Sequence, residues 1–283
     1  MTGALLVDKP GGLTSHDVIA RVRRIFRIRQ AGHTGTLDPF ATGLLVVLLG
    51  RATRLARFVE RQAKTYLATA RLGQATTTDD LTGEPVGEPA PVTLNETELR
   101  AALAGFLGRS SQRPPAFSAK KVAGERSYRR ARRGETVDLA PVPIEVLDAA
   151  VIGWTPPEVT FRVTVSTGTY VRALARDLGA RLGTGAHLTA LRREAVGALR
   201  VEQAVPLDSL TAETPVLPPL AVLGHLPATE LAAEQARTVR HGGAVEAAAG
   251  TSGLVALTCA GSLLAVGRVE DGRIRPVVVL EGA

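Results

Sequence analysis

The chain has 283 residues, of which 45% are hydrophobic, and this length favours one large domain with a second, small one. The 34 Lys and Arg residues exceed the 27 Asp and Glu residues, so the net charge of +7 makes nucleic acid the leading partner class; an arginine content set by a GC-rich genome is the alternative. The single cysteine excludes an internal disulfide, and the five histidines lack the spacing of metal ligands.

The N-terminus shows no targeting or membrane segment. No basic region precedes its apolar run over residues 3–7, as a signal peptide would require. No apolar run approaches the ~20 residues that span a bilayer. We therefore expect a cytoplasmic protein.

The first thirty residues predict a strand and a helix. The strand covers residues 3–8 and ends at a Pro-Gly-Gly turn. Thr14 and Asp17 have the spacing of a capping box, so a helix should begin there. Its apolar face has helical spacing: Val18, Val22, Ile25 and Phe26. Four arginines on the other sides form either a solvated surface or a guide for phosphates: Arg21, Arg23, Arg24 and Arg27.

Residues 32–43 predict a shaped loop rather than a helix or a strand, because they contain three glycines and a proline. Asp38 precedes that proline, which favours an extended or turn geometry at Asp38. A run of apolar residues, 44–49, follows and should be a buried strand. Asp38 is then either a functional carboxylate beside a rigid element or part of an Asp-Pro turn, and these residues alone leave both interpretations open.

The next segments predict a helix over 52–62, a strand over 64–73 and a short helix over 96–107. In the strand, Tyr66 shares one face with Ala68 and Ala70. Residues 74–94 have no clear period and predict a long loop.

Residues 110–121 form a basic, proline-stiffened segment with one aromatic side chain. This composition suits contacts with an RNA backbone and equally suits an ordinary surface loop. Five arginines over 126–133 continue the basic character on a predicted short helix. Strands are expected over 143–152 and 158–166, the second with clean alternation of apolar residues.

A second helix with a functional candidate follows Gly168. Its apolar face includes Val171, Leu174 and Leu178, and Gly183 marks its end. Arg172 therefore lies in the first turn, where the helix dipole disfavours a cation. Such a break with the local rule indicates either a site residue or a surface arginine. A strand is predicted over 186–193.

The C-terminal quarter has a different character. Prolines mark a junction within 205–225, and glycines then separate short apolar segments, a pattern typical of a small β-barrel or half-barrel. We place the domains at 1–215 and 216–283.

In their order, these motifs resemble a known family, the bacterial tRNA pseudouridine synthases that modify uridine 55 of the T arm. The likeness covers roughly residues 3–200, and Asp38 lies in its most specific motif. The aromatic residue that often precedes Ser118 in this family is Phe117 here, so no tyrosine hydroxyl is available at that position. The matching stretches are Asp8-Lys9-Pro10, residues 32–43, Lys64-Thr65-Tyr66, residues 70–73, residues 113–119, Gly168-Thr169-Tyr170-Val171-Arg172 and residues 185–193.

The resemblance implies an α+β fold: a pseudouridine synthase catalytic domain with a mixed, mainly antiparallel central sheet flanked by helices, plus a small β-barrel-like PUA domain. It also implies an isomerase that detaches uracil from ribose and rejoins it through C5, without metal or cofactor. Asp38 aligns with the essential carboxylate. Tyr66 aligns with the tyrosine that stacks on the target base and is the candidate base for the C5 proton. Arg172 aligns with the arginine that pairs with that carboxylate.

Five further residues are implied to contact the substrate. Leu191 aligns with an apolar residue of the uracil pocket, although ordinary core packing is hard to separate from that role. His33 aligns with the histidine that fills the space left by the flipped base, and Asp80 with a residue near the substrate. Tyr170 and Lys9 lie within matching motifs and are expected to contact it too.

The implied partner is the T arm of tRNA. The resemblance implies that a monomer binds it and that no membrane takes part. Two alternatives keep the scaffold: a non-catalytic protein that binds or folds RNA, and a pseudouridine synthase that depends on a guide RNA. A non-catalytic protein should have lost the catalytic carboxylate or the base, whereas Asp38, Tyr66 and Arg172 are all present. Activity without a guide RNA would separate the second.

Overall fold

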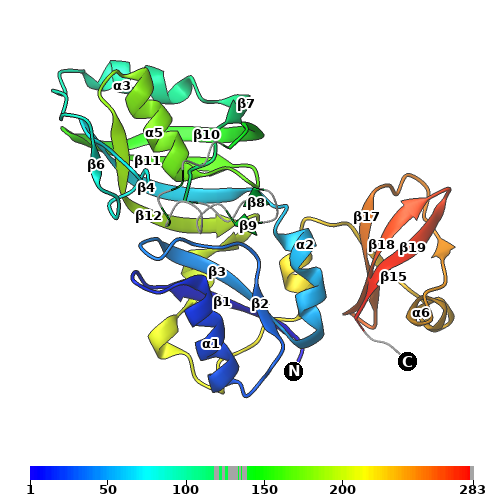
Figure 1. Cartoon of the computed structure of the whole chain (residues 1–283). Coiled ribbons are helices and arrows are strands. Elements are labelled where there is room, and N and C mark those ends of the chain that lie inside the picture. The colour runs from blue at the N-terminus through cyan, green and yellow to red at the C-terminus, as the bar shows by residue number, and fades with distance from the viewer. Residues whose placement is uncertain (118–120, 123–124, 127–132, 134, 136–138, 281–283) are drawn as a thin grey trace. The chain divides into compact units, whose positions relative to one another are not determined.

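The computed structural model describes residues 1–117, 121–122, 125–126, 133, 135 and 139–280 (Figure 1). The chain divides into two compact units. The first unit combines Met1–Gln62 with Ala195–Ala283, and the second unit is Ala63–Glu194. No helix in the described part of the chain is long and apolar enough to cross a membrane.

The N-terminal part of the first unit is a small mixed sheet. Strand β1 pairs antiparallel with β3 and parallel with β14, and β2 pairs antiparallel with β3. The run Leu44–Leu49 is buried throughout, which confirms the predicted core strand. The predicted loop over 32–43 is wrong at both ends, because residues 32–33 belong to β2 and residues 42–43 belong to β3. The strands are β1 (Gly3–Lys9), β2 (Ala31–His33), β3 (Thr42–Leu49) and β14 (Val205–Pro206).

Helix α1 (Ser15–Ile25) begins as the sequence predicts. Thr14 and Asp17 form the capping box, and Val18 and Val22 are buried. The predicted helix over 52–62 is confirmed over residues 52–59 and ends three residues early. A 3-10 helix, η1 (Gly50–Leu55), leads into a short α2 (Ala56–Val59). The Thr53 hydroxyl donates to the Gly50 carbonyl at 2.8 Å, and such local side-chain bonds compete with a regular α-helix.

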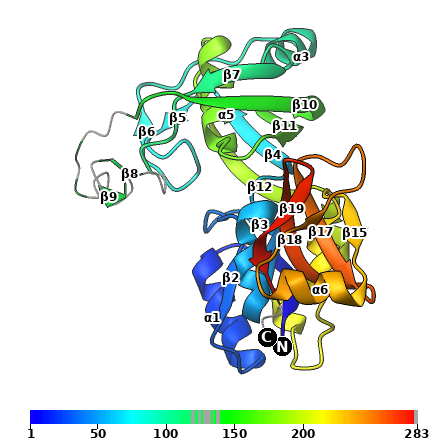
Figure 2. The same ribbon diagram turned by 90° about the vertical axis from the view of Figure 1, so that its right-hand side faces the viewer.

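The C-terminal part of the first unit is a five-stranded sheet in the order β15-β17-β18-β19-β16, with α6 packed against β18 and β19 (Figure 2). Its two outer strands do not pair with each other, so it has the half-barrel form that the glycine-separated segments predict. The elements are β15 (Ala228–Glu230), α6 (Ala233–Arg240), β16 (Val245–Glu246), β17 (Leu254–Cys259), β18 (Ser262–Glu270) and β19 (Arg273–Val279).

Short elements connect the two parts of the first unit. One apolar cluster of this unit contains Leu48, Phe58, Val222 and Val266, so side chains from both parts share a core. The connecting elements are β13 (Leu199–Arg200), which pairs with the end of β12, η2 (Val201–Gln203), η3 (Leu207–Ser209) and η4 (Pro219–Leu223).

The second unit is built on an antiparallel sheet. The strand order is β12-β4-β11-β10-β7, with β4, β11, β10 and β7 antiparallel. In β4, alternate residues from Tyr66 are buried, which confirms the predicted face. The strands are β4 (Lys64–Leu72), β7 (Gly108–Gln112), β10 (Val142–Thr155), β11 (Glu158–Val165) and β12 (Ala186–Val196), whose last two residues belong to the first unit.

Two helices pack on this sheet, α3 (Glu96–Ala104) against β10 and α5 (Val171–Arg181) against β4, and they contact each other (Figure 1). Helix α5 has Arg172 in its first turn, as predicted, and Gly183 follows its end with a φ of +72°. Gly179 lets the helix approach the next strand, because a Cβ there would lie 2.3 Å from the Ala186 nitrogen.

The predicted loop over 74–94 contains two short strands, β5 (Ala75–Thr76) and β6 (Pro85–Val86), which pair antiparallel. A second small pair, β8 (Lys121–Val122) and β9 (Glu125–Arg126), lies in the basic region. Apart from Arg126 and Arg133, the helix predicted over 126–133 lies in positions that the structure does not describe.

Candidate functional site

The eight predicted site residues fall into two groups. One group belongs to the first unit: Lys9, His33 and Asp38. The other belongs to the second unit: Tyr66, Asp80, Tyr170, Arg172 and Leu191.

Asp38 is half-buried on a segment whose backbone is fixed on both sides. The Ser15 hydroxyl is buried and bonds twice to Leu37: it accepts from the Leu37 amide at 2.9 Å and donates to the Leu37 carbonyl at 3.1 Å. On the other side, the Gly12 amide donates to the Pro39 carbonyl at 2.8 Å. The carboxylate therefore sits between two anchored residues, which is the rigid support that an activated or charge-stabilising group needs.

Lys9 is fully buried directly beneath this segment. Its ammonium donates to the carbonyls of Pro10 at 2.9 Å, Leu13 at 2.7 Å and Pro39 at 3.3 Å. A buried ammonium needs such acceptors, because removing it from water is otherwise costly. These contacts hold the residue after Asp38, and the expected contact of Lys9 with substrate stays a prediction.

His33 ends β2 and is half-buried. Its Nδ1 accepts a hydrogen bond from the Gly35 amide at 3.4 Å. Gly35 has a φ of +135° and Gly43 a φ of +99°, which other residues adopt only with strain. The two glycines therefore define the path of the chain on either side of Asp38.

Tyr66 and Leu191 lie on the neighbouring strands β4 and β12 of the second unit, and each is less than a tenth exposed. Tyr170 is the residue before α5. Its amide donates to the Gln112 side-chain oxygen at 2.9 Å, and its carbonyl accepts from the Gln112 side-chain nitrogen at 3.1 Å. Gln112 is buried, so this double contact fixes the start of the helix.

Arg172 is 5% exposed and is brought together with Asp80. Its Nη1 lies 3.4 Å from Asp80 Oδ2 and donates to the Thr78 carbonyl at 2.9 Å. Its Nη2 donates to the Phe117 carbonyl at 3.0 Å. A guanidinium buried in this way is not a surface arginine, and the role of Arg172 in the reaction stays a prediction.

Asp80 is itself buried and held by its own loop. Its Oδ1 accepts from the Thr78 hydroxyl at 2.7 Å, the Thr82 hydroxyl at 2.6 Å and the Thr82 amide at 3.0 Å. These bonds hold the carboxylate in one orientation. They leave Oδ2 as the oxygen that faces Arg172.

Three residues that belong with this arrangement were not among the predicted ones: Asp79, Gln112 and Arg176. Asp79 and Arg176 form an ion pair at 3.1 Å. Burial raises the pKa of Asp79, while the charges of Arg176 and Arg172 act to lower it. The available sequence signals were two adjacent acids in the loop and two arginines four residues apart, Arg172 and Arg176, which share a helix face.

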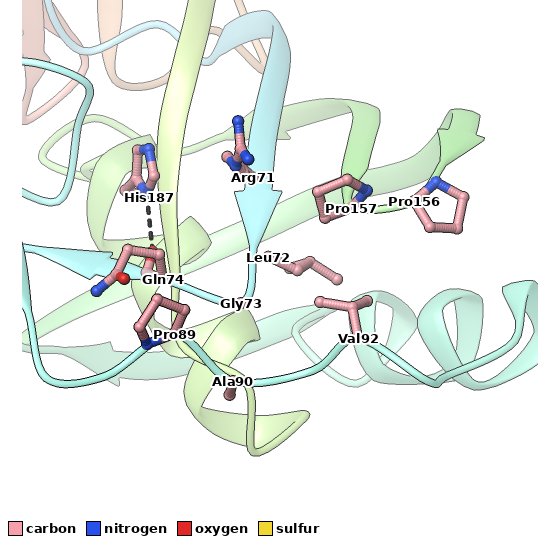
Figure 3. Close-up of a pocket in the computed structure, with 10 residues that line it drawn as sticks. All are labelled: Arg71, Leu72, Gly73, Gln74, Pro89, Ala90, Val92, Pro156, Pro157 and His187. Carbon is pink, nitrogen blue, oxygen red and sulfur yellow. Dashed lines mark hydrogen bonds between the residues drawn. The ribbon is translucent and has the colours of Figure 1, made fainter.

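A pocket of about 650 Å³ lies elsewhere in the second unit, at the end of β4 (Figure 3). Beside it, the His187 Nδ1–H donates to the Gln74 carbonyl at 2.7 Å. None of the eight predicted residues lines this pocket. Its lining residues are Arg71, Leu72, Gly73, Gln74, Pro89, Ala90, Val92, Pro156, Pro157 and His187. Among the residues that the structure describes, no group of three or more His, Cys, Asp or Glu side chains could hold a metal ion.

Solved structures share this fold. A structure described as "Crystal Structure of a Cbf5-Nop10-Gar1 Complex" superposes with a TM-score of 0.78 at 26% identity, covering 99% of this chain and 85% of that chain. Another, "Structure of H/ACA RNP bound to a substrate RNA containing 2'-deoxyuridine", has a TM-score of 0.76 at 24% identity with the same coverage and shows the fold alone. The α+β fold with a C-terminal half-barrel is thus confirmed as that of pseudouridine synthases.

Family models match nearly the whole chain. They are "TruB family pseudouridylate synthase (N terminal domain)" over residues 23–171, "tRNA pseudouridylate synthase B C-terminal domain" over 172–216 and "tRNA Pseudouridine synthase II, C terminal" over 226–281. The chain belongs to the TruB family of pseudouridylate synthases.

Curated relatives that match this chain over nearly their full length have names that agree with the family models. A protein of Thermobifida fusca named tRNA pseudouridine synthase B is 48% identical, covering 99% of both chains. Proteins of the same name from Arthrobacter sp. and Xanthomonas oryzae are each 42% identical, covering 99% of this chain and 96% and 94% of theirs.

Proposed function

We propose that this protein isomerises uridine 55 to pseudouridine in the T loop of tRNA. The observation that carries the proposal is the 48% identity to a tRNA pseudouridine synthase B over 99% of both chains. The protein is accordingly an isomerase that acts on tRNA uridine, and it needs no second substrate because the product has the same atoms.

The reaction breaks the bond between ribose C1′ and uracil N1 and forms a bond between C1′ and C5. C5 loses a proton and N1 gains one, so the change is balanced within the nucleotide. Asp38 supplies the carboxylate, acting on the ribose, on the base or on a ribose proton. All three routes need a carboxylate held in one position, and the bonds around Leu37 and Pro39 supply that support.

Two residues of the second unit complete the proposed chemistry. Tyr66 stacks on the base and takes the C5 proton. Arg172 pairs with Asp38 and keeps it ionised. Its burial beside Asp80 supports this role, because a guanidinium with so many fixed contacts is preorganised before substrate arrives. Leu191 lines the uracil pocket, and Asp80 and Tyr170 support it.

A uridine in a folded loop must leave its stack before the enzyme reaches its glycosidic bond. In our proposal, His33 fills the vacated space in the RNA, and the net charge of +7 favours binding to the T arm. We infer a monomer acting in the cytoplasm, where its tRNA substrate is.

The test is tritium release from an unmodified tRNA transcript that carries 5-tritiated uridine. The wild-type protein should release tritium without any added RNA, which separates it from a guide-dependent synthase. Asp38→Asn should slow release by at least about 1,000-fold and keep most of its affinity for tRNA, because the side chain keeps its size and loses only its charge. Turnover by Asp38→Asn, or release confined to uridines outside position 55, would contradict the proposal.

A further inference from the structure

Two adjacent carboxylates of the second unit face two different arginines of α5. Arg172 Nη1 lies 3.4 Å from Asp80 Oδ2, and Arg176 Nη1 lies 3.1 Å from Asp79 Oδ2. The two arginines are four residues apart on the helix, so their side chains are neighbours on one face. Each of the two carboxylates thus faces a guanidinium, and Arg176 also pairs with Asp177 of its own helix, Nη2 to Oδ1 at 2.8 Å.

Asp79 lies within the electrostatic reach of both arginines. It is 9% exposed, and burial raises the pKa of its carboxyl. The charge of Arg176 lowers that pKa most, and the charge of Arg172 comes next. Asp177, from the same helix, raises it. Arg172 is therefore the cation that Asp79 would attract if Arg176 were missing.

The backbone of Asp79 is held in one position. Its φ is +60°, and its carbonyl accepts from the Leu188 amide at 3.0 Å. A carboxylate fixed here without its arginine would remain close to α5.

The two arginines also share the segment before residue 118. Arg176 Nη2 donates to the Arg113 carbonyl at 2.9 Å, and Arg172 Nη2 donates to the Phe117 carbonyl at 3.0 Å. A competing interpretation follows from these bonds: Arg176 could simply tether that segment to the helix. The two interpretations differ in whether the charge of Asp79 matters.

We propose that Arg176 is a positioning residue for the isomerisation, because it neutralises Asp79 and so keeps Arg172 on Asp80. The inference rests on the proposed function, which assigns Arg172 to the reaction. Without Arg176, two buried carboxylates compete for one guanidinium, and Arg172 is drawn from its place. Removing the charge of Asp79 as well ends the competition.

The test compares four variants in single-turnover tritium release with saturating tRNA. Arg176→Gln should be at least about 10-fold slower than wild type, and Arg176→Lys should stay within about 3-fold because it keeps the charge. The double variant Arg176→Gln/Asp79→Asn should recover to within about 3-fold of wild type. The affinity for tRNA should change by less than about 2-fold in all of them. Arg162→Gln is the matched control, since Arg162 forms an exposed ion pair with Glu194 in the same unit.

Two outcomes would overturn the inference: full speed in Arg176→Gln, or a double variant as slow as the single one, which is what a tether predicts. If Arg176→Gln does not fold, the double variant must still fold and turn over, and its failure counts against the inference. Loss of Arg176 should also raise the pKa of the Asp79 carboxyl in a carbon-13 NMR titration. The NMR titration does not depend on activity, so it tests the inference separately from the proposed function. A wild-type protein that releases no tritium would refute the proposed function instead.

Discussion

The two groups of site residues are held by different physical means. In the first unit, Asp38 is fixed through its neighbours in the backbone, by the neutral Ser15 hydroxyl, the Gly12 amide and the buried Lys9 ammonium. In the second unit, Arg172 and Asp80 are fixed through their own charged side chains.

This difference separates residues held through their backbone from residues held through their side chains. In the proposed function Asp38 reacts through its carboxylate, and support from the adjacent peptide groups holds the residue through its backbone. An arginine has five donors, and Arg172 donates to the Thr78 and Phe117 carbonyls and pairs with the Asp80 carboxylate. Loss of support should therefore cost more stability in the second unit than in the first.

The largest effect is expected for Arg172→Ala. The change leaves the Asp80 carboxylate buried without its cation, and breaking a buried pair on one side typically costs about 3–5 kcal/mol of unfolding free energy. Urea unfolding measures it. The control Arg162→Ala removes an exposed ion pair and should cost no more than about 1 kcal/mol. Equal losses in the two variants would show that burial does not distinguish the pairs.

A smaller effect is expected for Ser15→Ala in the first unit. The Leu37 amide and carbonyl lose their shared partner, and an unsatisfied buried polar group costs about 1–3 kcal/mol. Tritium release should slow as well, because Leu37 precedes Asp38. The matched control is Ser209→Ala, an exposed serine in the same unit. Normal stability with normal turnover in Ser15→Ala would remove this support from the proposal.

The sequence predicted the elements whose signals are local. The alternation from Tyr66 gives a strand face, and the apolar spacing from Val171 gives a helix whose first turn contains Arg172. The loop at 74–94 was harder, because its strands have two residues each and Asp80 is fixed by an arginine 92 positions later, at Arg172. Such pairings leave no period in the sequence.

The candidate site was predicted in part. The glycines and proline around Asp38 indicate a shaped segment, but the roles of Tyr66, Arg172 and Leu191 came from resemblance to a family. Asp79 and Arg176 were missed because an acid in a polar loop and an arginine on a helix are ordinary surface residues until the fold buries the acid and pairs it with the half-buried arginine. Burial of charge is a tertiary property that no local pattern contains.

The smallest effect is a pH dependence carried by Asp79. Burial raises the pKa of its carboxyl above the ordinary value of 3.8, so the folded protein binds this proton more tightly than the unfolded chain does. The carboxyl therefore stabilises the fold fully below pH 3.8 and loses that contribution as the pH rises through the raised value. Asp79→Asn removes the titration, so its stability relative to wild type should increase from pH 4 towards neutrality, by at most about 1.4 kcal/mol per unit of pKa shift. Urea unfolding of both proteins over this range measures the difference. A wild-type protein that instead gains stability relative to Asp79→Asn as the pH rises would show that the ion pair with Arg176 outweighs burial, and that the charges in the second unit are stabilising as well as fixed in place.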